Sequence, residues 1–450
     1  MQETDVMVIG GSAAGIVAAT TAKSFHPEKN VMLVRKDAHV LVPCGIPYIF
    51  GTLENSAKNL VPDSVLSNAG IELKIDEVLA LDTAQKTCST ADGSTIRFDK
   101  LILATGSNPV KPGWLEGADL DNVFTIPKNK AYLDDLKSRL AACQRIAVVG
   151  GGFIGVELAD ELKKTGKEVL LIEMMPHILS AAFDAELAEK AEEVVASRGI
   201  EVKTGSGIKQ IRGEQKVSEV VLNNSETLPA DAVILSVGYK PNVTLAADSG
   251  LPINDMGFIK VNEYMRTENP DIFAVGDCAE KYSFVTRTLK GTMLASTSCA
   301  EARIAAMNLY QLSTVRSFGG TIAIYCTAIG ETALGAAGVT ENLARDRRFD
   351  VVTGAFEGVD RHPGSLPDTR PQTVKLIASR DSGTVLGGEV IGGKSTGELT
   401  NLIGLIIQNQ MTVDAVLTAQ IGTHPLLTAP PTAYPLIKAA EIIARKRKGI

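Results

Sequence analysis

One order of apolar and polar positions occurs twice in the first half of the chain. Residues 5–9 form an apolar run that ends at Gly10, and an alanine-rich stretch with helical spacing leads to a second apolar run at 31–34. Residues 145–149 and Gly150 begin the same order again, 140 residues later. A strand, a glycine turn, a helix and a second strand form a unit whose strands lie parallel. The pattern therefore predicts two separate parallel-sheet α/β units.

Further apolar runs follow each unit. Residues 100–103 resemble a buried strand that ends in a turn of small residues, and residues 232–237 form a matching element after the second unit. A third run, at 271–275, ends in a Gly-Asp pair, and residues 293–312 then have alanine-rich helical spacing. The elements on either side of the second unit thus complete the first one, which we expect to be discontinuous.

The pattern changes at about residue 320. Short strand-like runs at 373–378 and 385–391 precede helical spacing at 399–408 and a proline-rich stretch. This mixture predicts a third, α+β domain, with domain boundaries that are uncertain by several residues. The domains expected from the whole pattern are 1–112 with 246–319, then 113–245, then 320–450.

Composition narrows the class of protein. The 450 residues are 45% apolar and 22% charged, with a net charge of −7 and a pI near 5.5, which favours neither nucleic acid nor anionic membrane as a partner. No basic segment precedes the apolar N-terminal run and no apolar run reaches the ~20 residues of a membrane span, so we expect a cytoplasmic protein. Six scattered cysteines without Cys-x-x-Cys spacing argue against a metal site.

The second glycine turn has the full spacing of a dinucleotide site. Gly150 makes the tight turn, Gly152 lets the backbone approach a pyrophosphate, and Gly155 lets the helix pack on the strand. Glu173 ends the next strand, where its carboxylate can bind a ribose 2′-hydroxyl and repel a 2′-phosphate. The turn therefore predicts an NADH site in preference to an NADPH site.

The first glycine turn departs from this spacing. Gly10 and Gly15 are present, but Ser12 replaces the second glycine. Arg35 stands where an acidic ribose ligand is expected, and Asp37 is the nearest substitute. We interpret the turn as a second dinucleotide site, because the third glycine and the alanine-rich helix are intact. A Rossmann-like unit without nucleotide is the alternative.

Cys44 has no cysteine partner nearby, because position 49 is Ile49 and the next cysteine is Cys88. Pro43 precedes it and a helix-like pattern follows at 48–53, so we expect Cys44 at a helix N-terminus with a lowered pKa. A thiolate there can attack a disulfide or persulfide, or reduce a peroxide. We expect the other five cysteines, from Cys88 to Cys326, to be small buried side chains.

These motifs together resemble the pyridine nucleotide–disulfide oxidoreductase family over essentially the whole chain. The stretch from Cys44 to Tyr48 is similar to its single-cysteine branch, which includes coenzyme A-disulfide reductases, NADH oxidases and peroxidases, and persulfide reductases. The resemblance implies Rossmann-like domains for FAD and NADH and a C-terminal α+β dimerisation domain. The cofactor-binding residues that it and the two turns suggest are Gly10, Ser12, Ala13, Gly15, Arg35, Lys36, Ala104, Thr105, Gly106, Gly150, Gly152, Phe153, Ile154, Gly155, Glu173, Gly238, Gly276 and Asp277.

The resemblance also assigns roles outside the cofactor turns. Phe153 resembles an aromatic gate over the flavin, with core packing as the alternative. His424 or Tyr434, from the partner chain of a homodimer, would supply a proton in place of a tyrosine that is missing here. Lys23 and Lys74 fall where relatives bind coenzyme A, while Val40 and Pro43 depart from that pattern.

Three functions remain open from the sequence. The first is an NADH- and FAD-dependent reductase of a small-molecule disulfide or persulfide, with coenzyme A as a candidate moiety, that works through Cys44. The second is an NADH oxidase or peroxidase in which Cys44 becomes a sulfenic acid. The third is a redox-responsive FAD-binding partner protein, which only Arg35 favours.

Overall fold

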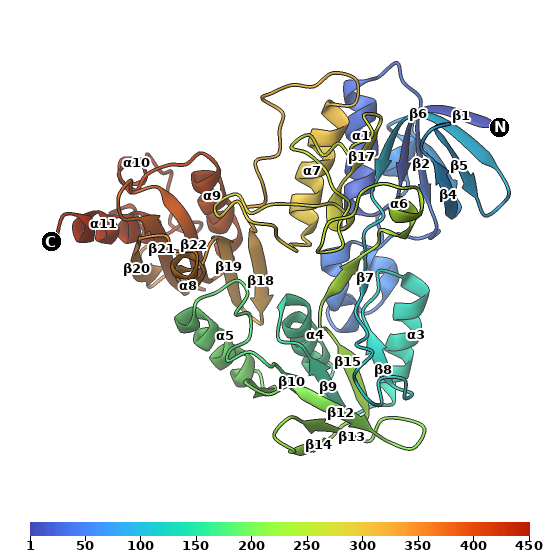
Figure 1. Ribbon diagram of the computed structural model, residues 1–450. Helices are drawn as coiled ribbons and strands as arrows, with labels where there is room; N and C mark the ends of the chain where they lie inside the picture. The colour runs from blue at the N-terminus through green and yellow to red at the C-terminus, as the bar shows by residue number, and fades with distance from the viewer.

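A computed structural model describes residues 1–450. The chain forms three units, each built around one main sheet (Figure 1). The first sheet has the strand order β3-β2-β1-β6-β5-β4, and β17 pairs with β6. Pairing is parallel except at β4–β5 and β5–β6, as the alternation of buried strands and helices predicts. Its strands are β1 (Gln2–Ile9), β2 (Val31–Arg35), β3 (Glu72–Ile75), β4 (Val78–Asp82), β5 (Thr87–Thr90), β6 (Thr95–Leu103) and β17 (Ile272–Ala274).

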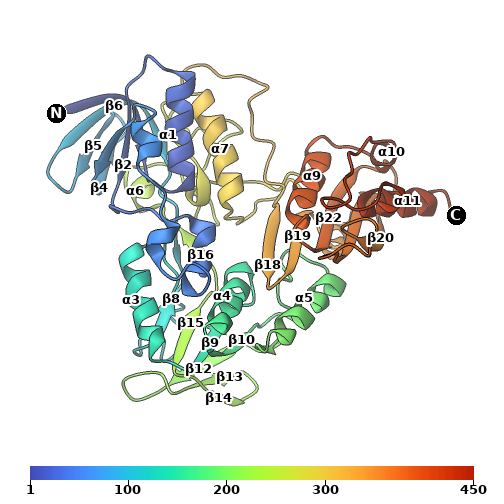
Figure 2. The same ribbon diagram turned by 180° about the vertical axis from the view of Figure 1, so that it is seen from behind.

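Helices α1 and α7 lie side by side against this sheet (Figures 1 and 2). Ala14, Ala18 and Ala22 are buried on α1, and Ala302 and Ala306 are buried on α7. Such small side chains let two helices approach closely while the interior stays densely packed. The helices of this unit are α1 (Ala13–Phe25), α2 (Ser64–Ser67), α6 (Thr244–Asp248) and α7 (Ala295–Met307).

The second sheet is entirely parallel, with the order β11-β10-β9-β15-β8. A separate antiparallel sheet, β12-β13-β14, lies at its end (Figure 1). The strands are β8 (Val123–Thr125), β9 (Arg145–Val149), β10 (Glu168–Ile172), β11 (Glu201–Lys203), β12 (Ile208–Arg212), β13 (Glu219–Leu222), β14 (Thr227–Pro229) and β15 (Ala232–Leu235). The helices are α3 (Lys130–Ala141), α4 (Phe153–Lys164) and α5 (Ala185–Ser197).

The chain leaves the first sheet after β6 and returns to it at β17, so the second unit is an insertion. The outgoing and returning segments pair with each other as the short antiparallel ladder of β7 (Ser107–Pro109) and β16 (Tyr239–Pro241). Asn242 accepts a 2.6 Å hydrogen bond at its carbonyl from the Thr105 hydroxyl next to this ladder. These contacts fix the second unit against the first.

The third sheet is antiparallel, with the order β18-β19-β22-β21-β20 and four helices around it (Figure 2). Predicted strands and a helix of the α+β region all appear here within a few residues of their expected ends. The elements are β18 (Tyr325–Ile329), β19 (Thr332–Gly338), α8 (Glu341–Asp346), β20 (Val351–Val359), β21 (Pro371–Ser379), β22 (Val385–Gly392), α9 (Thr396–Gln408), α10 (Val413–Leu417) and α11 (Pro435–Arg447). None of the helices in the structure is long and apolar enough to span a membrane.

Candidate active site

A cavity of about 400 Å³ takes its walls from all three units. The N-termini of α1, α4 and α7 open onto it, and the residues before these helices, Ser12, Gly152 and Leu294, make no side-chain cap. Uncapped helix N-termini offer free backbone N–H groups to an anion. The predicted site residues that line this cavity are Ser12, Ala13, Cys44, Ala104, Gly106, Gly152, Phe153, Ile154, Gly238, Gly276 and Asp277.

Cys44 does not stand at the start of an α-helix, as we expected from its flanking sequence. It lies in a 3₁₀ turn, Pro43–Gly45, and a second 3₁₀ turn, Pro47–Phe50, follows. Two prolines this close together favour short turns, because each removes a backbone donor. Cys44 therefore lacks the helix dipole that was expected to stabilise its thiolate.

The surroundings raise the pKa of Cys44 instead of lowering it. Burial raises it most, the Glu157 carboxylate raises it further, and the Lys128 ammonium lowers it. The side chain is exposed, but it faces a cavity with a mainly apolar wall and not bulk solvent, so protein still surrounds the thiolate. Without bound groups, the Cys44 thiol is therefore largely protonated at neutral pH.

Lys128, Asp277 and Ser107 form a bonded group in the same wall. The Lys128 ammonium lies 2.6 Å from an Asp277 carboxylate oxygen and 3.2 Å from the Ser107 hydroxyl, which itself donates to Asp277 at 2.7 Å. Burial alone would raise the pKa of Asp277, but Lys128 and the Ser107 hydroxyl hold it below its usual range. Asp277 is therefore a fixed anion that can accept hydroxyl groups of a bound ligand.

A buried ion pair supports the backbone at Gly276. Glu301 accepts a 2.7 Å hydrogen bond from the Gly276 N–H, and Lys281 donates to the Gly276 carbonyl at 2.9 Å. Lys281 and Glu301 are 3.5 Å apart and almost completely buried. This pair holds the turn that presents Asp277 to the cavity.

Glu157 lies on α4 one turn after Phe153 and lines the cavity. Burial raises its pKa to about 7, although Thr327 of β18 donates a 2.8 Å hydrogen bond to one carboxylate oxygen. A carboxyl with a pKa near neutrality can hold or release a proton under working conditions. Glu157 was not among the predicted site residues.

The glycine turns fit two dinucleotides. Gly10 and Gly150 have φ values of 110° and 108°, in the region that favours glycine. A Cβ on Gly15 would lie 1.8 Å from the Gly10 carbonyl oxygen, so that position needs glycine for helix packing. A Cβ on Gly152 would meet nothing within 4 Å, which leaves the close backbone approach that a pyrophosphate requires.

Glu173 follows β10 and is held beside the second turn. Its carboxylate accepts hydrogen bonds from the N–H groups of Gly151, at 2.6 Å, and Met175, at 2.7 Å. The predicted ribose ligand is thus oriented in advance by the glycine turn itself. Glu173 does not line the 400 Å³ cavity.

Arg35 is the last residue of β2 and Lys36 follows it, but both side chains lie away from the cavity. Arg35 is buried beneath Gly11, where its guanidinium bonds the carbonyl oxygens of Asp37 and Ala38, each at 2.9 Å, and the Asp63 carboxylate at 2.8 Å. Lys36 is exposed and pairs with Glu77 at 2.9 Å. Neither lines the cavity, so cofactor binding by these two residues stays a prediction.

His424 and Tyr434 lie in the third unit, outside the cavity walls of their own chain. His424 is exposed, and its Nδ1 accepts a 3.2 Å hydrogen bond from the Leu426 N–H. Tyr434 packs against the core of the third unit, and burial raises its pKa. A role for either residue at a cavity therefore requires the cavity of another chain.

Lys23 and Lys74 are already bonded within the first unit. Lys23 donates to the carbonyl oxygens of Pro27 and Lys29 at 2.9 and 2.8 Å. Lys74 pairs with Asp92 at 2.6 Å and with Asp76 at 3.4 Å. Each ammonium would have to leave these partners to bind a phosphate.

The prediction that the other cysteines are buried is right for Cys88, Cys143 and Cys278. It is wrong for Cys299, which is half-buried, and for Cys326, which is exposed and lines the same cavity as Cys44. Cys299 lies on α7 with its sulfur 3.9 Å from the Ala13 carbonyl oxygen of α1, whereas Cys326 lies on β18, where the third unit borders the cavity. All six cysteines are free thiols.

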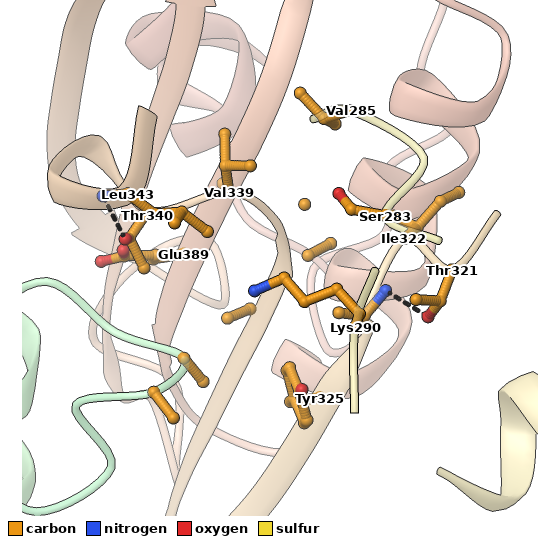
Figure 3. A pocket seen from close by; sticks show the side chains of 17 residues that line it. Ser283, Val285, Lys290, Thr321, Ile322, Tyr325, Val339, Thr340, Leu343 and Glu389 are labelled. Atoms are coloured by element: carbon orange, nitrogen blue, oxygen red, sulfur yellow. Dashed lines mark hydrogen bonds between the residues drawn. The ribbon is translucent and has the colours of Figure 1, made fainter. Parts of the chain in front are cut away.

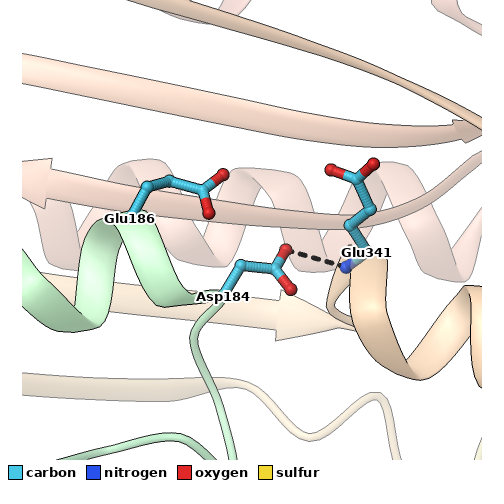
Figure 4. A group of neighbouring side chains, drawn as sticks. All are labelled: Asp184, Glu186 and Glu341. Carbon is cyan, nitrogen blue, oxygen red and sulfur yellow. Dashed lines mark hydrogen bonds between the residues drawn. The ribbon is translucent and has the colours of Figure 1, made fainter. Parts of the chain in front are cut away.

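The acidic side chains of Asp184, Glu186 and Glu341 gather away from this cavity (Figure 4). The Lys375 ammonium lies 2.9 Å from Asp184 and 3.2 Å from Glu341, and it also donates to Glu186. A lysine thus already supplies the positive charge that these carboxylates need. The group joins the second and third units through Lys375.

Sequence reasoning missed several residues of the cavity. Glu157 had a usable signal, because residues four apart on a helix share a face and Phe153 was already placed in the site. Tyr239 directly follows the predicted Gly238, whereas Lys128, Tyr325 and Cys326 had no signal, since each comes from a segment with no motif of its own.

Family models identify the chain. The model of the pyridine nucleotide-disulphide oxidoreductases matches residues 4–302, and the model of the dimerisation domain of the same family matches residues 324–434. The chain therefore belongs to the pyridine nucleotide-disulphide oxidoreductase family and is an oxidoreductase, as its motifs predicted. This family uses FAD and NAD(P)H.

Individual relatives span nearly the whole chain. An NADH oxidase of Methanocaldococcus jannaschii is 29% identical over 98% of both chains. An NAD(P)H coenzyme A polysulfide/persulfide reductase of Pyrococcus horikoshii is also 29% identical, over 97% of this chain and 98% of that relative. The structure of an NAD-dependent persulfide reductase from A. fulgidus has a TM-score of 0.91 and 28% identity, and the match covers 99% of this chain and 84% of that one.

Proposed function

We propose that the chain is an FAD-dependent NADH oxidoreductase that reduces a disulfide, persulfide or polysulfide through Cys44. One observation carries the proposal: a single cavity brings Cys44 together with the N-termini of three helices and with Asp277. The same cavity contains no second thiol within the Cys44 segment, because position 49 is Ile49. Cys326 of β18 also lines the cavity, but it belongs to a separate segment, and we propose that the second sulfur of the exchange comes from the substrate.

We propose one cofactor for each of the two units on the basis of their glycine turns. Ser12, Ala13 and Asp277 suit FAD, and Gly152 with Glu173 suits NADH. When bound, FAD would supply the chemistry that links a hydride from NADH to the two-electron reduction of sulfur. The protein's part is to orient both groups and to set the charge around Cys44.

Cys44 acts by thiol–disulfide exchange. Its thiolate attacks one sulfur of the substrate, so a Cys44–sulfur bond forms, the substrate's S–S bond breaks, and the first sulfur leaves as a thiolate that takes up a proton. Two electrons from NADH then cleave the Cys44–sulfur bond and release the second product. For a disulfide the sum is RSSR′ + NADH + H⁺ → RSH + R′SH + NAD⁺. The Lys128 ammonium favours the Cys44 thiolate. The Glu157 carboxylate disfavours that thiolate, and protonation of Glu157 removes this effect.

A homodimer would complete this site. His424 and Tyr434 are absent from the cavity of their own chain, and residues 324–434 match a dimerisation domain. We propose that one of them, from the partner chain, protonates the departing sulfur. If that residue is His424, a mixture of Cys44→Ser and His424→Ala chains regains activity that neither variant has alone.

Coenzyme A as part of the substrate has mixed support. The Pyrococcus horikoshii relative is named for coenzyme A, but Lys23 and Lys74 already have hydrogen-bond partners here. The sulfur chemistry at Cys44 does not depend on that moiety. Coenzyme A is therefore a secondary part of the proposal.

NADH oxidase or peroxidase activity is the second candidate, favoured by the name of the Methanocaldococcus jannaschii relative. In that case a peroxide would oxidise Cys44 to a sulfenic acid, and NADH would reduce it back to the thiol with release of water. The same residues serve both functions. Only the oxidised form of Cys44 differs.

The deciding experiment is anaerobic NADH titration of the holoenzyme, with flavin absorbance and intact mass followed before and after. The reductase predicts that Cys44 carries a sulfur adduct that NADH removes. The oxidase predicts a single added oxygen. A flavin that NADH does not bleach would contradict both functions.

Cysteine variants from the same cavity make the test specific. We expect Cys44→Ser to lose roughly 100-fold or more of its disulfide or persulfide turnover, while NADH still reduces the flavin. Cys326→Ser is the matched control, because that thiol lines the same cavity outside any cofactor motif. Full turnover by Cys44→Ser would remove the reductase proposal.

A further inference from the structure

Two aromatic rings from different units stack in the cavity wall. The Phe153 ring, at the start of α4, lies parallel to the Tyr325 ring of β18, with 4.9 Å between centroids and 8° between planes. The Phe183 ring is a second neighbour of the Phe153 ring, with 6.4 Å between centroids and 51° between planes. Stacked rings prefer one relative orientation. The Phe153 ring is therefore held by a residue 172 positions away in the chain.

Tyr325 also lines a small second cavity (Figure 3). It has a volume of about 30 Å³, and Tyr325 lines both this cavity and the larger one. Alanine and glycine form much of its wall, including Ala182, Ala336 and Gly388. A cavity of this volume holds about one water molecule, so it gives the Tyr325 ring room for only a small displacement.

Strand β18 also contacts α4 at a second point. Two residues after Tyr325, the Thr327 hydroxyl donates to Glu157 at 2.8 Å. Tyr325 and Thr327 point to the same face of the strand, because side chains alternate along it. The strand is thus fixed against the helix while the stacked ring borders open space.

We propose that Tyr325 is a positioning residue for nicotinamide entry: its ring holds Phe153 in the cavity wall, and Phe153 must leave this stack when nicotinamide binds. This inference rests on the proposed use of NADH. The third unit would then influence nicotinamide access directly, through a contact that no glycine motif contains. Loss of the stack makes the movement of Phe153 less costly and strengthens nicotinamide binding.

The test compares two ligands of the oxidised holoenzyme by calorimetry. NAD⁺ carries nicotinamide and ADP-ribose does not, so the ratio of their dissociation constants isolates the nicotinamide end. We expect Tyr325→Leu, which keeps apolar packing without a stacked ring, to strengthen NAD⁺ binding relative to ADP-ribose by roughly threefold to tenfold. Tyr325→Phe keeps the ring and retains the wild-type ratio.

A double-variant cycle with Phe153→Leu tests whether the rings act together. We expect Tyr325→Leu to add nothing in the Phe153→Leu background, because the stack is already gone. An unchanged ratio in Tyr325→Leu, or equal and additive effects, overturns the role of Tyr325 while NADH use stands. Wild-type protein that binds neither ligand overturns the proposed function together with this inference.

Discussion

The turn that begins at Gly10 and the turn that begins at Gly150 share one backbone geometry. Their first glycines have φ values of 110° and 108°, and a Cβ on Gly15 or Gly155 would lie 1.8 Å from the carbonyl oxygen of the respective first glycine. In both units the next strand pairs in the same register beside the turn. The fold thus builds the same cradle twice.

The side chains around the two cradles differ. The first unit has Val17 where the second, 140 positions later, has Glu157. After the paired strands, Arg35 is buried under its own turn, whereas Glu173 bonds the backbone of its turn from the edge. The comparison teaches that two turns can share one backbone geometry, while a few side chains give only the second turn a carboxylate bonded to its backbone and a proton-holding group nearby.

Substitution of the third glycine should have the largest effect. Gly15→Ala and Gly155→Ala each place a Cβ against a backbone carbonyl, and we expect a loss of about 3 kcal/mol or more of stability in the affected unit. Gly15→Ala should lose bound flavin, and Gly155→Ala should keep flavin but lose NADH binding. Flavin absorbance per chain and NADH titration check this. The reverse pattern would exchange the two assignments.

Glu157 should make stability depend on pH in a way that Val17 does not. Its folded pKa of about 7 exceeds its ordinary value of 4.5, so the native state binds more protons than the unfolded state between these values. Stability from this group is therefore full below about pH 4.5 and declines as pH rises toward 7, by roughly 3 kcal/mol at most. Urea unfolding at several pH values should show a smaller decline in Glu157→Gln.

Arg35 should matter for stability more than its counterpart Glu173. Arg35→Met leaves two carbonyl oxygens without their donor, and we expect a loss of about 1–3 kcal/mol in the free energy of unfolding. Glu173→Gln keeps only one acceptor oxygen for the N–H groups of Gly151 and Met175, so we expect a smaller loss of about 0.5–1 kcal/mol. Equal losses would show that the two positions are structurally equivalent after all.

Glu173→Gln should affect nucleotide choice instead. Removal of the carboxylate weakens the bond to a ribose hydroxyl and the repulsion of a 2′-phosphate. We expect the KM for NADH to rise by roughly tenfold, with a smaller change for NADPH. Steady-state kinetics with both nucleotides measures the ratio, and an unchanged ratio would remove Glu173 from ribose binding.

The charges around Cys44 should produce the smallest effect, in opposite directions. Glu157 raises the pKa of the Cys44 thiol and Lys128 lowers it. The midpoint of Cys44 alkylation by iodoacetamide against pH should move down by about half a unit in Glu157→Gln and up in Lys128→Met. Intact mass follows the reaction, and shifts of the same sign would contradict the geometry.

Local patterns predicted much of the fold because each depends on near neighbours. Glycine spacing located both turns, and apolar periodicity located β1, β9 and α9 within a few residues. The same logic failed at Cys44, where the pattern suggested a helix but two prolines produced short 3₁₀ turns. The pattern also did not reveal that Arg35 is buried beneath Gly11, which depends on contacts outside its strand, and cofactor binding by Arg35 stays a prediction.

The sequence by itself determined the two glycine cradles, the lone thiol of the Cys44 segment and the order of the three units. Glycine torsions, missing side chains and apolar periodicity are short-range properties, so the order of residues is enough to reveal them. Only the tertiary structure decided the electrostatics of Cys44, the pKa of Glu157 and the stack of Phe153 on Tyr325. These depend on burial and on contacts between segments far apart in the chain, which only packing brings together.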